Sequence, residues 1–367
     1  MDSLVIRYEV QQMRVCHFTS AHETTDVRIF LKECQSLQKS GHEVFLVGRG
    51  KSGERAGIHI IGCGEPKSRM DRFLFFSKKV YRKALELDCA VYHFHDPDLL
   101  RYANKLQRRG KRVIFDSHED VPAQIFDKTW IPGIFRSLVA KVYKKYETRI
   151  VGKLDAVVVA TPHIAEIFQG RARKIEVLNN YPRLDDIRFH SESYQKREPM
   201  VCFVGGISEA RGESTMLEAM KKVEGKLVIA CKHEKVRIED GGIVEYIGQI
   251  DRRMVNQIYG KAVAGLVLYK SRKNHMESQP IKMYEYMAAG LPVVCSNFPA
   301  WEKIMKETGA GIFVNPENPE EVAEAIRYLL HNRDKAQEMG RKGRKAVEQK
   351  FSWDMEEKKL NQLYHEL

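Results

Sequence analysis

The segment 277–292, ESQPIKMYEYMAAGLP, places charged side chains at the entrance of an otherwise apolar helix. A proline suits the start of this predicted helix, and the final Gly-Leu-Pro ends it. Glu277 precedes the helix, whereas Lys282 and Glu285 lie in its first turns. Carboxylates and a lysine near the positive end of a helix dipole can hold a polyol together with a phosphate. The alternative is a capped core helix with exposed charges.

A glycine-rich turn, GGISEARG, follows the predicted strand 201–204 and precedes a helix. Gly205 and Gly206 would let the backbone approach a ligand, and free N–H groups at a helix start bind phosphate. Arg211 could clamp a diphosphate with its planar guanidinium. The alternative is a tight turn with a surface arginine. The spacing matches neither GxGxxG nor GxxxxGK[ST], which disfavours a dehydrogenase and a P-loop kinase.

Histidines and acids follow three strands in the first half of the chain. The segments are TSAHETTD with His22, FHDPD with His95, and DSHED with His118 and Glu119. A histidine can position or deprotonate a hydroxyl near neutral pH, and we assign this role to His118. The alternative for His118, and more so for His95, is an ordinary loop histidine.

The Asp96-Pro97-Asp98 triplet resembles the DxD of metal-dependent sugar transferases, but it precedes a helical pattern. We therefore interpret it as a helix N-cap. No His/Cys cluster has the spacing of a transition-metal site, so we predict no metal.

The elements that position these residues alternate between strand and helix in two successive series. This pattern predicts an α/β fold with two doubly wound parallel sheets that face a central cleft. We predict an N-terminal domain over 1–185, a C-terminal domain over 186–350 and a final helical segment over 351–367. The polar, irregular segment 180–199 suits an interdomain linker. In a 3-2-1-4-5 strand order the three histidine loops converge, because strands 1, 4 and 5 are neighbours.

Composition restricts the class of protein. The 367 residues are 43% hydrophobic and 30% charged, and no apolar run approaches the roughly 20 residues of a membrane span. Seven dispersed cysteines without a CxxC pair, and no signal-peptide core, indicate a cytoplasmic protein with reduced thiols. The net charge of +12 favours an anionic partner.

Two basic amphipathic stretches, 72–87 and 135–151, match helices that can lie on the anionic inner face of the cell membrane. The usual alternative is a core-facing stripe with a solvated basic face. A nucleic-acid groove would need interleaved exposed aromatic residues and a known module, and we find neither.

The segment ESQPIKMYEYMAAGLPVV resembles the E-x7-E signature of retaining glycosyltransferase family 4, with Glu277 and Glu285 as its glutamates. FVGGISEARG is similar to the donor motif of that family. VYHFHDPDLL and VIFDSHEDVPAQI resemble the acceptor-domain loops of a branch typical of bacterial surface-polysaccharide synthesis. The resemblance covers about residues 14–365.

The resemblance implies a GT-B fold, a UDP- or GDP-sugar donor and a glycan or lipid-linked acceptor. It also implies a role for each matching residue. Glu285 would bind ribose, Glu277 the transferred sugar, and Arg211 the diphosphate with help from Lys282, next to Gly205 and Gly206. His118 would lie near the acceptor and the anomeric carbon, with His22, His95 and Glu119 also on the acceptor side. No metal or other cofactor is implied, and the last helix, 353–366, would pack on the first domain.

The chain departs from the family pattern at three places. Glu277-Ser-Gln-Pro280 replaces a glycine-containing start, Gly205-Gly206 replaces Gly-Arg, and TSAHETTD lacks a double glycine.

Three functions are compatible with these sequence features to different degrees. The first is transfer of a sugar onto a growing glycan. The second is a nucleotide-sugar epimerase or phosphorylase of the same fold. The third is a basic protein that binds a membrane or nucleic acid without catalysis. The coordinated placement of Arg211, Glu277, Lys282 and Glu285 argues against this third function.

Overall fold

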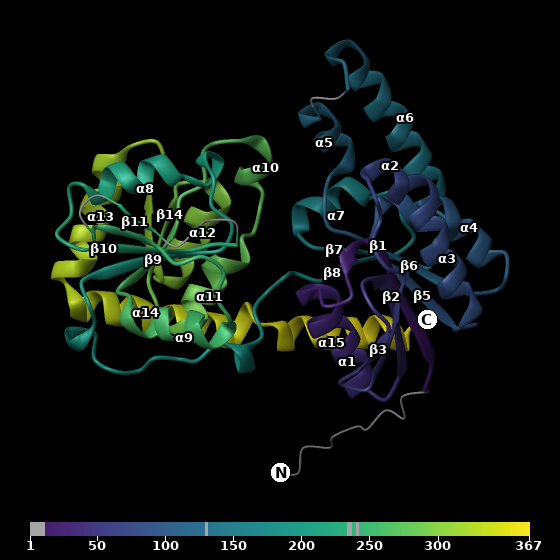
Figure 1. The fold of residues 1–367 in the computed structure, drawn as a ribbon, viewed down its shortest axis with the longest axis horizontal. Coiled ribbons are helices and arrows are strands. Elements are labelled where there is room, and N and C mark those ends of the chain that lie inside the picture. Colours follow the sequence, from purple (N-terminus) through teal and green to yellow (C-terminus); the bar gives the residue numbers. More distant parts are fainter. Residues whose placement is uncertain (1–11, 129–130, 233–236, 240–241) are drawn as a thin grey trace. The chain divides into compact units, whose positions relative to one another are not determined.

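A computed structural model describes residues 12–128, 131–232, 237–239 and 242–367 of the chain (Figure 1). The chain forms two compact units: residues 1–180 with 356–367 make unit 1, and residues 181–355 make unit 2. These boundaries lie five residues from the predicted ones, at 185 and 350.

Unit 1 is built on an eight-stranded sheet of order β3-β4-β2-β1-β5-β6-β7-β8, parallel except at β3. Apart from β3, the order corresponds to the predicted 3-2-1-4-5 arrangement, extended by two strands. The strands are β1 (Arg14–Glu23), β2 (Glu43–Arg49), β3 (Gly53–Arg55), β4 (Ile58–Gly62), β5 (Val91–Phe94), β6 (Arg112–Ser117), β7 (Ala156–Val159) and β8 (Ile175–Val177).

Helices cover both faces of this sheet. They are η1 (Val27–Cys34), α1 (Gln35–Lys39), α2 (Arg69–Asp71), η2 (Arg72–Phe76), α3 (Ser77–Glu86), η3 (Pro97–Leu99), α4 (Leu100–Gln107), α5 (Val121–Asp127), α6 (Gly133–Val151), α7 (Pro162–Phe168) and the end of α15 (Trp353–His365). Alternate residues of β1, β5 and β6 enter one apolar core, among them Phe18, Phe94 and Phe115. The residues between them point to the opposite face, and there the polar side chains gather.

Unit 2 has a seven-stranded sheet of order β11-β12-β10-β9-β13-β14-β15, parallel except at β11. Its strands are β9 (Met200–Val204), β10 (Lys226–Ala230), β11 (Arg237–Glu239), β12 (Val244–Tyr246), β13 (Ala264–Val267), β14 (Val293–Ser296) and β15 (Gly311–Val314). One apolar core packs on each face of this sheet.

The helices of unit 2 follow the same alternation. They are η4 (Leu184–Asp186), η5 (Tyr194–Lys196), η6 (Glu209–Arg211), α8 (Glu213–Met220), α9 (Arg252–Lys261), α10 (Lys273–Met276), α11 (Ile281–Ala289), α12 (Pro299–Thr308), α13 (Pro319–His331) and α14 (Arg333–Lys350). Helix α11 ends at Gly290, whose φ of 80° is the left-handed conformation predicted for this position.

The predicted linker 180–199 is largely a folded part of unit 2. Tyr194 and Arg197 are buried, and the guanidinium of Arg197 lies 3.5 Å from the centre of the Tyr194 ring. Arg197 also donates to the backbone oxygen of Ala262 at 2.7 Å. The linker prediction was therefore wrong for these residues, because polarity and a lack of periodicity also describe an irregular segment that packs on a domain.

Candidate functional site

In unit 1 the three predicted histidine loops meet at the ends of β1, β5 and β6. The ring centres of His22 and His118 lie 5.6 Å apart, and those of His95 and His118 lie 5.8 Å apart. Because these strands are neighbours in a parallel sheet, their carboxyl ends share one edge. The fourth acceptor-side candidate, Glu119, has an exposed side chain, and its backbone oxygen accepts a hydrogen bond from Ser117 Oγ.

Asp96 connects the loop after β5 to the loop after β1. Its carboxylate accepts from the backbone N–H groups of Ser20 and Ala21, at 2.6 and 3.1 Å, and from Thr19 Oγ1 at 2.7 Å. The carboxylate makes no capping bond to the helix that follows it. Asp96 is thus the N-cap residue of η3 (Pro97–Leu99), as interpreted from the sequence, but its side chain bonds N–H groups of the neighbouring loop and none of the helix.

Asp96 also forms an ion pair with His22, whose Nδ1 lies 3.2 Å from Asp96 Oδ1. Burial by itself would raise the pKa of Asp96, but the contacts with His22, Thr19 and Ala21 outweigh burial and lower this pKa. Burial likewise would lower the pKa of His22, and the bond and charge of Asp96 raise it instead. The pair therefore favours a charged His22.

Asp116 is the buried carboxylate that contacts His118. Its Oδ2 lies 3.1 Å from His118 Nε2, and Arg28 binds both carboxylate oxygens, at 3.1 and 3.2 Å. Burial would raise the pKa of Asp116, but Arg28, His118 and His95 lower it well below its usual value. An ionised Asp116 can orient the His118 ring, so that His118 can accept a proton.

Further polar residues of this site were missed by sequence reasoning. His17 and His93 are fully buried, and Tyr364 of α15 contacts both, at 3.2 Å from His17 Nε2 and 2.9 Å from His93 Nδ1. Burial lowers the pKa of both histidines well below the usual value. One signal was available, since the alternation of His93 and His95 in a strand already places both on one face.

The glycine-rich turn of unit 2 lies against Arg211. The Arg211 guanidinium donates to the backbone oxygen of Gly206 at 2.8 Å. A Cβ atom on Gly206 would come within 2.2 Å of that guanidinium, and Gly205 has a φ of 119°. The two glycines thus give this turn its conformation and leave room for Arg211.

Lys282 points from α11 toward the same turn. A Cβ atom on Gly205 would lie 3.3 Å from Lys282 Nζ, which sits 3.5 Å from the centre of the Phe203 ring. This ammonium is buried and has no hydrogen-bond partner in the described ranges of the chain. Burial and the charge of Arg211 lower the pKa of Lys282 to about 7. A buried cation without a partner, next to a second cation, is suited to bind an anion.

Glu285 is one turn further along α11, and it is already paired. Its oxygens contact Arg252 Nη2 at 2.8 Å and the Tyr259 hydroxyl at 3.2 Å. Both partners come from α9, and sequence reasoning identified neither. Glu277, by contrast, is exposed in the segment between α10 and α11. The structure therefore gathers Gly205, Gly206, Arg211 and Lys282 closely, with Glu285 on the same helix as Lys282.

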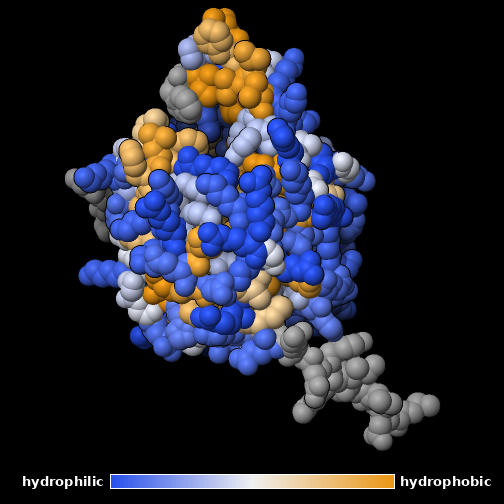
Figure 2. All heavy atoms as spheres, turned by 90° about the vertical axis from the view of Figure 1, so that its right-hand side faces the viewer, coloured by the Kyte–Doolittle hydropathy of each residue, from blue (hydrophilic) through white to orange (hydrophobic). Residues whose placement is uncertain are grey.

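A second surface of unit 1 carries exposed apolar side chains beside lysines and arginines. In α6, Ile134 is 83% exposed, and Leu138 and Val142 are also exposed; in η2, Phe75 is 69% exposed. Figure 2 shows hydrophobic side chains gathered at the end of unit 1 where Figure 1 draws α5 and α6.

The exposed basic residues of α6 are Lys141, Lys144, Lys145 and Arg149. The expectation of a core-facing stripe was wrong for most of the stripe of 135–151, and it holds at its Ile150 and partly at Tyr143, which pack on the core. The stripe residues on the exposed side are Phe135, Leu138, Val139, Val142 and Tyr146. The expectation was also wrong for the exposed residues 73–75 of the stretch 72–87, whereas Phe76, Val80 and Tyr81 of that stretch are buried. Periodicity defines a stripe but not the side on which the sheet lies.

Within the described ranges, no helix is both long enough and apolar enough to cross a membrane.

Two family models match adjacent parts of this chain. The model described as glycosyltransferase family 4 matches residues 27–181, and the model described as glycosyl transferases group 1 matches residues 185–346. The two matches correspond closely to units 1 and 2.

Curated relatives include a phosphatidyl-myo-inositol mannosyltransferase of Mycobacterium leprae, 25% identical over 78% of this chain and 76% of the relative. A D-rhamnosyltransferase of Pseudomonas aeruginosa is 21% identical over 93% of this chain and 92% of the relative.

Among solved structures, the sucrose-phosphate synthase of Thermosynechococcus elongatus is similar with a TM-score of 0.75 and 17% identity, over 96% of this chain and 98% of that one. The Anabaena protein HepE, solved in complex with UDP, is similar with a TM-score of 0.70 and 11% identity, over 97% of this chain and 100% of that one. At these identities the likeness shows the fold, a GT-B arrangement of two α/β units.

Proposed function

The chain belongs to the glycosyltransferases of the family 4 type with a GT-B fold. From this membership we propose that it is a retaining enzyme of cell-surface polysaccharide synthesis. It moves a sugar from a UDP- or GDP-sugar to a glycan or lipid-linked acceptor. The observation that carries the proposal is the buried ammonium of Lys282, which lacks a partner in the described chain and faces the Gly205 turn beside Arg211. HepE, which shares the fold, was solved with UDP bound.

In this proposal unit 2 holds the donor. Arg211 and Lys282 bind the diphosphate, whose charge grows as the sugar departs, so that the two cations stabilise the leaving group. Glu285 exchanges its contact with Arg252 or Tyr259 for the ribose hydroxyls, and Glu277 contacts the transferred sugar. No metal takes part in the transfer, because these cations supply the positive charge.

Unit 1 supplies the acceptor side. The His118 ring, oriented by Asp116, binds the acceptor hydroxyl and receives its proton during transfer. His22, His95 and Glu119 shape the same side of the reaction. Positioning and leaving-group stabilisation therefore account for most of the rate enhancement.

Thermal stabilisation by a ligand panel tests the donor site. The panel contains UDP, GDP, ADP, NAD and common UDP- and GDP-sugars, each with and without EDTA. A ligand at a hundredfold excess over Kd stabilises the native state by about 2.7 kcal/mol. We expect a shift with one nucleoside diphosphate, insensitive to EDTA and reduced in Glu285→Ala and Arg211→Ala. Glu218→Ala and Arg253→Ala, on exposed helix positions, are the matched controls. Unchanged affinity in both site variants would refute the assignment.

The exposed apolar and basic residues of η2 and α6 support a contact with the inner face of the cell membrane. Apolar side chains would enter the lipid boundary while Lys141, Lys144, Lys145 and Arg149 meet anionic headgroups. This contact would bring a lipid-linked acceptor to unit 1.

Vesicle sedimentation tests this contact. Vesicles that contain phosphatidylglycerol should bind the chain, and vesicles of phosphatidylcholine alone should bind it more weakly. The Leu138→Asp, Val142→Asp double variant should lose roughly tenfold or more in partitioning to the vesicles. Full burial of one such apolar side chain contributes about 1.5–3 kcal/mol of binding free energy. Met254→Asp, at an exposed apolar position of unit 2, should bind as the wild type does. Equal loss in both variants would contradict the proposed surface.

A further inference from the structure

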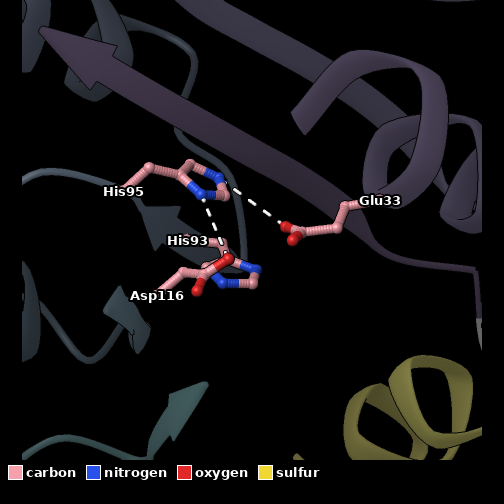
Figure 3. A group of neighbouring side chains, drawn as sticks. All are labelled: Glu33, His93, His95 and Asp116. Atoms are coloured by element: carbon pink, nitrogen blue, oxygen red, sulfur yellow. Dashed lines mark ion pairs between the residues drawn. The ribbon is translucent and has the colours of Figure 1, made fainter. Parts of the chain in front are cut away.

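A buried cluster in unit 1 contains several polar atoms without hydrogen-bond partners. Glu33 of η1, His93 of β5, His95 just after β5 and Asp116 of β6 are each fully buried or nearly so. One oxygen or ring nitrogen from each lies within 4.8 Å of the corresponding atom of the others (Figure 3). Among the residues described, neither oxygen of Glu33, His93 Nε2 nor His95 Nδ1 has a hydrogen-bond partner, although Glu33 Oε1 forms an ion pair with Arg28 and His95 Nδ1 forms one with Asp116. Because native cores rarely leave such atoms without hydrogen bonds, the cluster has room for a ligand, above all at His93 Nε2, for which the described residues offer neither a hydrogen bond nor an ion pair.

The other ring nitrogen of each histidine is already engaged. His93 Nδ1 lies 2.9 Å from the Tyr364 hydroxyl, and His95 Nε2 lies 3.0 Å from His17 Nδ1. Histidines that bind a metal show this arrangement, in which one nitrogen binds the ion and the other makes a hydrogen bond that fixes the ring. His93 Nε2, which has no hydrogen bond among the described residues, and His95 Nδ1, which faces Asp116, are therefore held in place to bind a ligand.

We propose that Glu33, His93, His95 and Asp116 bind one divalent transition-metal ion, with Zn²⁺ the best match to two imidazoles and two carboxylates. Four protein ligands are typical of a closed, structural zinc site. The separation of His95 Nδ1 and Asp116 Oδ2, 3.4 Å, already suits two ligands of one ion, given metal–ligand bonds of about 2.0–2.2 Å. The other ligand atoms lie within 4.8 Å of one another, so the longest separation would shorten by roughly 1–1.5 Å to reach a tetrahedral site with bonds of this length.

The ion has a structural role in this proposal. With no open position it touches neither donor nor acceptor, so it is compatible with a transfer reaction that uses no metal. It would fix Asp116, which in turn contacts His118 at 3.1 Å.

One cation already lies beside these carboxylates. Arg28 Nε is 3.0 Å from Glu33 Oε1 and 3.1 Å from Asp116 Oδ2. The competing occupant of the cluster is a proton on Glu33, since burial and the charge of Asp116 raise the pKa of that carboxyl well above its usual value. A protonated Glu33 and a metal-bound Glu33 exclude one another, so metal content distinguishes the two states.

The first experiment measures metal content in the wild-type chain, without an affinity tag and without chelators during purification. We expect close to one Zn²⁺ per chain by inductively coupled plasma mass spectrometry. Protein stripped of metal under mild denaturant should have a lower Tm, which added Zn²⁺ restores, and Co²⁺ should give the visible absorption of a tetrahedral site. A wild-type chain that holds less than a tenth of an equivalent, and whose Tm does not respond to Zn²⁺ or Co²⁺, would overturn the proposal.

Variants then test the site assignment. His93→Gln and Glu33→Gln should each lower the bound Zn²⁺ roughly tenfold or more. His59→Gln, on the β4 strand of the same sheet and outside the cluster, should keep the wild-type stoichiometry. Metal retained in both cluster variants would overturn the assignment. If a cluster variant does not fold, the metal content and Tm of the wild-type chain still decide whether the metal site exists. None of these readouts depends on transferase activity, so the outcome is separate from that of the donor-site tests.

Discussion

In unit 1 the buried carboxylate of Asp116 contacts Arg28 and His118, whereas in unit 2 the buried ammonium of Lys282 has no hydrogen-bond partner within the described ranges. The charge in unit 1 is balanced by the protein itself, so its ion pair helps to stabilise the folded state. The charge in unit 2 has no hydrogen bond or ion pair with any residue that the structure describes, so it raises the free energy of the ligand-free state. Removing the two charges should therefore change stability in opposite directions.

The largest effect is expected from Asp116→Asn. This change leaves the buried Arg28 guanidinium without its bidentate partner, and we expect a loss of about 3–5 kcal/mol in the free energy of unfolding. Chemical denaturation in the presence of EDTA measures the ion pair without any metal contribution. Asp88→Asn is the matched control, since Asp88 is 81% exposed and pairs with Lys111 at the surface. A loss under about 1 kcal/mol in Asp116→Asn would show that unit 1 does not depend on this pair.

Lys282→Met should have the opposite effect on stability. Replacing an unpaired buried cation by an apolar chain of similar length should leave the free energy of unfolding unchanged or raise it by about 1 kcal/mol. Affinity for the nucleoside diphosphate should fall roughly 10- to 100-fold, as expected for a lost charge-assisted hydrogen bond. Denaturation and calorimetric titration on the same preparations measure both quantities. Reduced stability with unchanged affinity would make Lys282 a purely structural residue.

The pH dependence of stability tests the charge of Lys282 directly. Its pKa is lowered to about 7 in the folded chain, against an ordinary value of about 10.4. Between these values the unfolded chain binds more protons, so the wild type should gain stability relative to Lys282→Met as pH rises above 7. The difference in free energy of unfolding between the wild type and Lys282→Met should change by close to about 1.4 kcal/mol per pH unit in this range. For Lys303→Met, at an exposed position, the difference in free energy of unfolding from the wild type should not change with pH. If that difference is also independent of pH for Lys282→Met, the result would contradict a buried ammonium.

The smallest effect is expected from His22→Gln in unit 1. The pKa of His22 is raised by Asp96, so its stabilising contribution is fully present below its unfolded pKa and is lost as pH rises through the folded pKa. The side chain of His22 is 35% exposed, so solvent screening should keep the effect under about 1 kcal/mol. The variant should be more destabilised relative to the wild type at pH 5.5 than at pH 8.5. A difference that does not depend on pH would show that the His22–Asp96 contact is not an ion pair.

Much of the fold could be predicted from the sequence. The alternation of strands and helices gave both sheets, and helix 281–289 ends at Gly290 as expected. The short antiparallel edge strands β3 and β11 were missed, because three residues are too few for a periodic pattern. Helix α5 was missed as well, since it is short and begins beside Pro122.

The polar sites were predicted only in part. The loop histidines could be identified because residues after neighbouring parallel strands must meet at one edge of a sheet. Their partners could not. Tyr364 contacts His93 from a position 271 residues away, and Arg28 reaches Asp116 across 88 residues. The spacing of His93 and His95 places these two histidines on one face, but no local spacing connects them to Glu33 or Asp116.

The sequence by itself determined the order of elements, the edge of each sheet that carries polar loops, and the residue types available there. These depend on local periodicity and on the geometry of parallel strands. Only the tertiary structure decided that Asp96 binds a neighbouring loop and that most of the apolar stripe of α6 faces outward. It also decided that Lys282 is buried with no hydrogen-bond partner among the described residues, while Glu285 is paired. Burial and the pairing of charges depend on which distant segments pack together, and a single segment does not contain that information.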